Sequence, residues 1–224
     1  MENLHKLKRW GAVAAIAVVA IIPVQIAIFA LRPPPADVRG FFELFEQSPL
    51  LGLLSLDLLY LLNNALMISV YLGLAACLYN ANQSAIITAL AVGLVGLATY
   101  YASSVAFEMM SLAKSFNGSS NPLLRQQLLA AGEGMLATYK GTAFDVYYIL
   151  NAITLFIFSW VMLKDSERTF TRTTALWGLA SAALMIIPST AGTIGLIFSL
   201  LSLVPWVVFS VLIAGRMRNI PDEV

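Results

Sequence analysis

The sequence predicts an all-α integral membrane protein, a polytopic helical bundle of six transmembrane helices that forms one domain over residues 1–224. Hydrophobic residues make up 59% of the chain and charged residues only 11%, with a mean hydropathy of +0.82. A soluble domain carries about 25% charged residues, so this chain cannot cover itself with a water-facing surface. Apolar runs near the ~20 residues that cross a bilayer recur along the whole length. We therefore expect a lipid bilayer to surround the protein.

Six apolar runs are predicted to be transmembrane spans. The first follows a basic segment, is longer than a signal peptide core and lacks a small-residue cleavage site, so we interpret it as an uncleaved span. The second is longer than a crossing requires, which indicates tilt or protrusion. The fifth is short and stops at Pro188. The predicted spans cover residues 10–31, 49–79, 85–110, 141–163, 173–187 and 194–215.

Two connections on one side of the bundle have helical patterns. In residues 36–48, aromatic side chains alternate with two glutamates, which suits a short interfacial helix or a loop with anchoring aromatics. Asn121 and Pro122 form a good helix start, since asparagine caps a helix and proline fits its first position. The segment 121–137 is predicted to be an external amphipathic helix that lies on the membrane or folds over the bundle.

The distribution of basic residues predicts the orientation. Six spans place both termini on one side, and eight basic residues lie near that side against five on the other. Basic residues favour the cytoplasmic side, so both termini are predicted to be cytoplasmic. The side of the termini carries Lys6, Lys8, Arg9, Lys164, Arg168, Arg172, Arg216 and Arg218, and the opposite side carries Arg32, Arg39, Lys114, Arg125 and Lys140.

Composition also excludes several function classes. The net charge of +1 and the absence of a basic arm argue against a nucleic-acid partner. Cys77 is the only cysteine, so no intramolecular disulfide can form. His5 is the only histidine and lies outside the spans, which argues against a membrane zinc hydrolase. No cofactor is predicted, and an enzyme is the least favoured class.

One short motif occurs twice. Residues 57–63 read Asp-Leu-Leu-Tyr-Leu-Leu-Asn, and residues 145–151 read Asp-Val-Tyr-Tyr-Ile-Leu-Asn. Both copies lie in the opening turns of predicted spans, where a carboxylate needs a partner because its desolvation is costly. The second and third spans are thus predicted to repeat as the fourth and fifth, related by an axis along the membrane normal.

Each copy places polar residues along one helix face. Side chains three, four and seven residues apart share a face, so Asp57, Tyr60 and Asn64 form a stripe with Asn63 on its flank. We expect these stripes to line an outward-facing polar cavity, roofed by segment 121–137 and joined by Glu108. The candidate ligand-binding residues are Asp57, Tyr60, Asn63, Asn64, Glu108, Asp145, Tyr148 and Asn151.

Several interpretations of these residues remain open at the level of sequence. Polar side chains in membrane helices often form interhelical hydrogen bonds without binding a ligand, and an aspartate near a helix start can cap it. If the pocket is functional, its aspartates would bind a small solute, a lipid head group or a cation. Binding or transport of that ligand is then the favoured function. Two mechanisms suit such a pocket. In one, an aspartate takes up a proton when the substrate binds, and in the other, Asp57, Asp145 and Glu108 coordinate a hard cation.

A different function class is the alternative. The protein would then be a non-catalytic membrane partner or sensor subunit, with segment 121–137 as its docking surface. Its partner would be a second copy of the chain or another membrane protein.

Three stretches carry a resemblance to a known family: residues 137–144 (Ala-Thr-Tyr-Lys-Gly-Thr-Ala-Phe), residues 170–178, and residues 199–206 (Ser-Leu-Leu-Ser-Leu-Val-Pro-Trp). On these motifs the chain resembles the prokaryotic six-span membrane proteins called domain of unknown function 4386. The resemblance covers most of the chain from the second span onward. It implies the six-span fold and a prokaryotic plasma membrane, and it implies no activity and no catalytic residues.

Overall fold

The computed structural model describes residues 2–139 and 141–219, and in this part of the chain it contains ten α-helices and no strand. The predicted all-α class is confirmed. Lys140, counted above among the basic residues, lies outside the described residues. The helices are α1 (Glu2–Leu31), α2 (Val38–Gln47), α3 (Pro49–Ser55), α4 (Leu58–Leu78), α5 (Gln83–Ser103), α6 (Ala106–Asn117), α7 (Pro122–Tyr139), α8 (Thr142–Lys164), α9 (Arg172–Leu184) and α10 (Gly192–Asn219).

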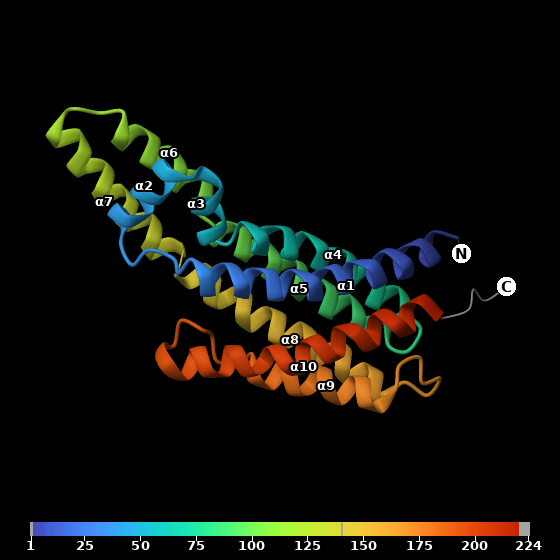
Figure 1. The fold of residues 1–224 in the computed structure, drawn as a ribbon. Coiled ribbons are helices and arrows are strands. Elements are labelled where there is room, and N and C mark those ends of the chain that lie inside the picture. The colour runs from blue at the N-terminus through green and yellow to red at the C-terminus, as the bar shows by residue number, and fades with distance from the viewer. Residues whose placement is uncertain (1, 140, 220–224) are drawn as a thin grey trace.

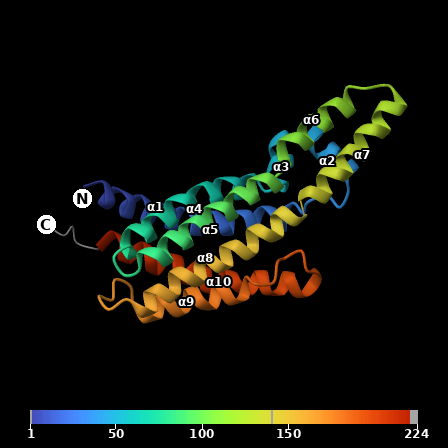
Figure 2. The ribbon, with the colours of Figure 1, turned by 180° about the vertical axis from the view of Figure 1, so that it is seen from behind.

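Six helices form a closed ring. Each packs against two neighbours in the order α1, α4, α5, α8, α9, α10 and back to α1, and contacts across the ring are few. The start of α1 and the end of α10 lie at the same end of this bundle (Figures 1 and 2). At the opposite end, α2, α3, α6 and α7 project beyond the ring, and we call these four helices the head.

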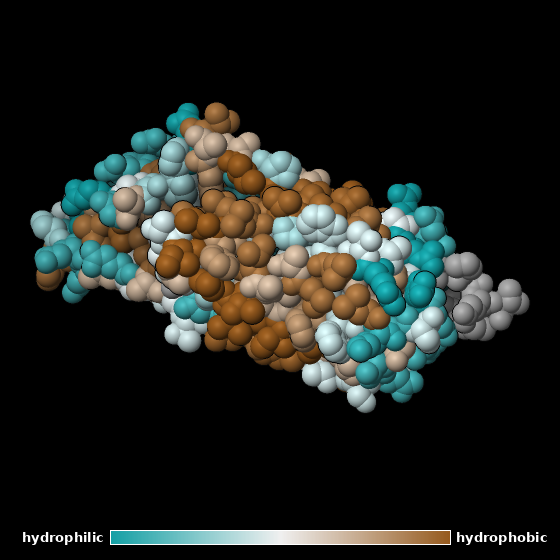
Figure 3. Space-filling view, turned by 90° about the horizontal axis from the view of Figure 1, so that it is seen from below, coloured by the Kyte–Doolittle hydropathy of each residue, from teal (hydrophilic) through white to brown (hydrophobic). Residues whose placement is uncertain are grey.

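The surface of the bundle is that of a membrane protein. Figure 3 shows a hydrophobic band over the middle of the molecule and hydrophilic residues at both ends. Among the described residues, five helical stretches are long and apolar enough to cross a membrane: α1, α4, α10, and the stretches 83–117 and 122–164. The 13 residues of α9 span only about 20 Å at 1.5 Å per residue. Length and composition therefore support a membrane crossing by five helical stretches, one fewer than the six predicted spans.

The predicted second span is two helices, which corrects the continuous span 49–79. The chain breaks between α3 and α4 at Asp57, whose φ of 62° is left-handed. The cause of the break is packing in the head. A Cβ on Gly52 would lie 2.4 Å from Cδ1 of Phe45, so α3 lies close against α2 and cannot continue along α4.

The predicted third span, residues 85–110, also ends earlier than expected. Helix α5 ends at Ser103, Ser104 is extended, and α6 begins at Ala106. Glu108 is therefore a residue of the head, where its side chain is exposed.

The head has its own core. Helix α2 is the amphipathic helix expected in residues 36–48, but its apolar face packs against α6 and α7. Helix α7 begins where Asn121 and Pro122 predict, since Asn121 Oδ1 accepts hydrogen bonds from the backbone nitrogens of Leu123 and Leu124. The buried core of the head is formed mainly by Val38, Phe41, Phe42, Phe45, Met109 and Phe116.

Candidate functional site

The ring of helices encloses a cavity of about 290 Å³ in the half of the bundle next to the head. Side chains from α1, α4, α5, α8 and α10 line it, together with the turn before α10. A second cavity of about 320 Å³ lies directly outside the first and shares Asp57, Phe144 and Ser189 with it. We call them the inner and the outer cavity.

Aromatic rings form one continuous wall of the inner cavity. Ring centroids are 6.3 Å apart between Tyr60 and Tyr100 and 4.8 Å apart between Tyr100 and Tyr147. The wall continues from Tyr147 to Tyr148 at 6.1 Å and from Tyr148 to Phe144 at 5.7 Å. Helices α4, α5 and α8 therefore present aromatic faces to the same space.

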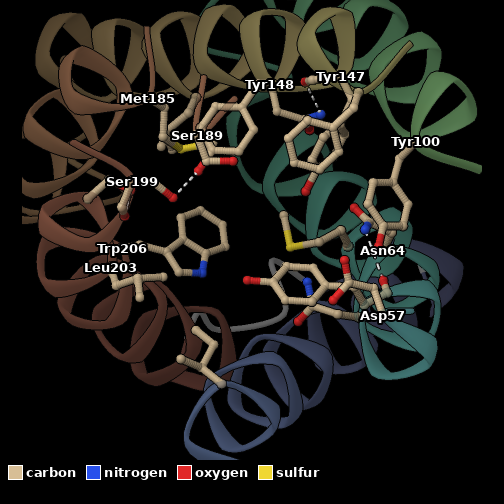
Figure 4. Close-up of a pocket in the computed structure, with 18 of the residues that line it drawn as sticks. Asp57, Asn64, Tyr100, Tyr147, Tyr148, Met185, Ser189, Ser199, Leu203 and Trp206 are labelled. Atoms are coloured by element: carbon tan, nitrogen blue, oxygen red, sulfur yellow. Dashed lines mark hydrogen bonds between the residues drawn. The ribbon is translucent and has the colours of Figure 1, made fainter. Parts of the chain in front are cut away.

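The other side of the cavity is built by α10. Figure 4 shows Trp206 and Ser199 facing Asp57, Asn64 and Tyr100 across the cavity. The hydroxyl groups of Ser199 and Tyr148 are 2.5 Å apart, and this hydrogen bond joins α10 to α8.

Asp57 is held at the junction of the two cavities by an unusual backbone conformation. It stands directly before α4, yet its side chain makes no capping hydrogen bond to that helix. Its carboxylate instead accepts a hydrogen bond from the Tyr139 hydroxyl at the end of α7. A left-handed φ of 62° is tolerated by aspartate better than by most residues and still costs about 1 kcal/mol. The alternative left open above, that an aspartate at this helix start caps it through its side chain, does not hold for Asp57.

A buried hydrogen-bond chain fixes the deep end of the cavity. Tyr71 and Asn151 are each 4% exposed, and the Tyr71 hydroxyl donates to Asn151 Oδ1. Asn151 Nδ2 in turn donates to the backbone oxygen of Tyr147, at 2.8 Å. The first of these bonds connects α4 to α8, where the two helices barely touch otherwise, and the second fixes the Asn151 amide within α8.

Other polar atoms at the cavity are buried without partners. Asn64 Nδ2 donates to the backbone oxygen of Tyr60, at 2.9 Å, which assigns Oδ1 to the opposite side of the amide. Asn64 Oδ1 and Asn63 Oδ1 have no hydrogen-bond partner, although the Tyr147 hydroxyl lies near Asn64. Both oxygens are enclosed by neighbouring atoms, so they add polarity to the packing around the cavity without presenting an exposed acceptor to it.

Six of the eight predicted site residues line the inner cavity. They are Asp57, Tyr60, Asn63, Asn64, Tyr148 and Asn151.

Glu108 and Asp145 do not line it. Glu108 lies in the head because α5 ends before it. Asp145 lies in the first turn of α8, and its carboxylate accepts a hydrogen bond from the Thr190 hydroxyl, a residue at the outer cavity. The expectation that both aspartates line one cavity does not hold for the inner cavity, because Asp145 lies inside the first turn of α8 whereas Asp57 precedes α4.

The structure gives no support to coordination of a hard cation by three carboxylates. Within residues 2–139 and 141–219, no group of three or more His, Cys, Asp or Glu side chains could hold a metal ion.

Sequence reasoning missed several lining residues, chiefly Tyr71, Tyr100, Ser199 and Trp206. The proline–tryptophan pair at 205–206 looks like a kink with an aromatic filler, yet Trp206 faces the cavity (Figure 4). The positions of the tyrosines in the predicted spans were a signal that could have identified the cavity wall. Five of the eight tyrosines line the inner cavity, and Tyr139 lines the outer one.

No family model matches the chain, and neither the curated proteins nor the solved structures contain a match. The resemblance to domain of unknown function 4386 stays a prediction.

Proposed function

We propose that the protein binds a small solute in the inner cavity, as a membrane receptor or transporter for that solute. The observation that carries this proposal is a 290 Å³ space inside a closed helix ring, lined by hydroxyl, amide and carboxylate groups. Asp57, Tyr60 and Asn64 are the central binding residues, and Tyr148 and Asn151 complete the site.

The proposal includes a membrane topology. Helix α9 completes the ring as a short sixth span, assisted by the turn that follows it, and both termini are cytoplasmic. In support, Arg216 Nε donates a hydrogen bond to the backbone oxygen of Thr169, at 2.6 Å. This contact brings the basic segments around both residues together at the end of the bundle where the two termini lie. The inner cavity then lies in the outer half of a prokaryotic plasma membrane, and α7 contributes its outer edge. The duplicated motif, whose tyrosines Tyr60 and Tyr148 both line the inner cavity, supports an internal repeat.

Accessibility of a single thiol tests the proposal. Ser199→Cys, made in a Cys77→Ser background, places a thiol in the inner cavity, and Ser210→Cys places one in the same helix where the side chain is only 1% exposed. Hydrophilic methanethiosulfonate reagents should label position 199 in maltoside micelles and leave position 210 unlabelled. Ser189→Cys, at the junction of the two cavities, is a second reporter should the first variant fold poorly. If neither position 199 nor position 189 reacts, solutes do not enter the cavity and the proposal is wrong.

A partner or sensor subunit remains the second candidate, and the head favours it. The ring does not need these four helices to close, yet α7 exposes Leu123 by 64% and Leu124 by 42%. A pull-down in a mild detergent separates the two functions. A stoichiometric protein partner that is lost after Leu123→Ser and Leu124→Ser supports the subunit, whereas a homogeneous species without a partner counts against it.

A further inference from the structure

We propose that the solute is an organic ammonium ion whose alkyl substituents contact the aromatic wall and whose charge faces Asp57. This inference rests on the proposed function, because it names the chemical class of the ligand in the same cavity. Two properties of the lining lead to it: the sign of its charge and its aromatic faces.

The charge of the lining is negative. Asp57 is the only carboxylate among the described residues that line the inner cavity, and no lysine, arginine or histidine in this part of the chain lines either cavity. The Tyr139 hydroxyl hydrogen-bonds to one oxygen of Asp57 and carries no compensating charge. In apolar surroundings a single carboxylate attracts a cation strongly and excludes anions.

The aromatic wall selects the type of cation. Faces of Tyr, Trp and Phe attract alkylated ammonium groups through the negative potential of their π-electrons, whereas hard metal ions prefer six or more oxygen ligands. Here five linked rings line the cavity, and Figure 4 shows Trp206 across it from Tyr100. The volume of about 290 Å³ also greatly exceeds that of a bare ion and suits a molecule of several heavy atoms.

Reaction rates at the cavity thiol test the inference. Three reagents react with the Ser199→Cys protein in the Cys77→Ser background: trimethylammonium-ethyl methanethiosulfonate, its neohexyl analogue with carbon in place of nitrogen, and sulfonatoethyl methanethiosulfonate. Each rate is divided by the rate at Ser120→Cys, an exposed position in the loop before α7. We expect the normalised rate of the ammonium reagent to exceed that of the neohexyl reagent by about tenfold, and that of the sulfonate by more.

Substitution of the aspartates identifies the source of this preference. Asp57→Asn keeps the side-chain shape, removes the charge and should abolish the preference for the ammonium reagent. Asp145→Asn is the matched control, since that carboxylate bonds to Thr190 and does not line the inner cavity, and it should retain most of the preference. Equal normalised rates for all three reagents, or a preference that survives Asp57→Asn, would overturn the inference and leave solute binding intact. Absence of any reaction would instead refute the proposed function.

The ammonium group has two sources, a lipid head group or a soluble ion. In nanodiscs, the rate at position 199 relative to position 120 is compared between phosphatidylglycerol alone and a mixture with phosphatidylethanolamine. A slower rate in the mixture supports a head group as the natural occupant. An equal rate, together with protection by added choline, supports a soluble ion. Equal rates with no protection by choline count against an ammonium ligand.

Discussion

Gly93→Ala is a sharp test of the packing that shapes the cavity. Gly93 lies in α5, where an added Cβ would stand 2.8 Å from Cε2 of Tyr71 and 2.9 Å from Cγ2 of Thr154. Carbon atoms normally pack at about 3.5–4.0 Å, so α4 and α8 must recede from α5 by roughly 0.6–1.2 Å. Neither neighbour can swing away, because Thr154 is fully buried and the hydroxyl of Tyr71 is bonded to Asn151.

The expected loss of stability follows from two opposing effects. Overpacking of a tight contact costs about 1–3 kcal/mol, and replacing glycine by alanine in a helix returns up to about 1 kcal/mol. We expect Gly93→Ala to lower the free energy of unfolding by about 1–2 kcal/mol, which corresponds to a drop in Tm of roughly 2–8 °C for a chain of this length.

The matched control is Gly215→Ala in α10, where nothing lies within 4 Å of an added Cβ. It should leave stability unchanged or raise it by up to about 1 kcal/mol. Both variants are measured by thermal unfolding in the same detergent, monitored by circular dichroism. If Gly93→Ala proves as stable as Gly215→Ala, the close approach of α5 to Tyr71 and Thr154 is wrong, and so is the cavity wall that depends on it.

Three further substitutions have defined outcomes, each measured by Tm in detergent. Tyr71→Phe should cost about 1 kcal/mol, because Asn151 Oδ1 loses its buried donor; full stability would contradict that hydrogen bond. Asp165→Ala should lower the free energy of unfolding by about 1–3 kcal/mol. Asp165 is 8% exposed, and its carboxylate accepts hydrogen bonds from the backbone nitrogens of Glu167 at 3.1 Å and Thr169 at 2.8 Å. The control Glu167→Ala should have little effect on stability. Asp57→Asn should change stability by less than about 1 kcal/mol, because asparagine tolerates a left-handed backbone, and a large loss would show that Asp57 acts mainly in folding.

The class of the protein and the limits of most helices follow from local sequence. Long apolar runs with few charges are typical of membrane spans, and α8 and α10 lie close to their predicted ranges, while α1 and α4 end where predicted, to within one residue. The start of α7 was equally predictable, because an asparagine followed by proline satisfies the first backbone groups of a helix without help from other segments.

The candidate site was predictable only as far as one helix determines it. Helical periodicity says that Asp57, Tyr60 and Asn64 share a face, and all three line the inner cavity. It does not say which neighbour that face meets. The contributions of Tyr100 and Trp206 depend on how α5 and α10 are rotated in the ring, which their own sequences do not specify.

Tertiary packing decided the different fates of the two aspartates. Their motifs read alike, but α3 packs against Phe45 in the head and forces the chain to turn at Asp57, while Asp145 continues inside the first turn of α8. The sequence by itself therefore determined a membrane bundle with polar residues near one end. The closure of the ring brings together residues as distant as Ile22 and Trp206. Only this closure decided that the Asp57 carboxylate faces the inner cavity, while the Asp145 carboxylate bonds to Thr190 at the outer cavity.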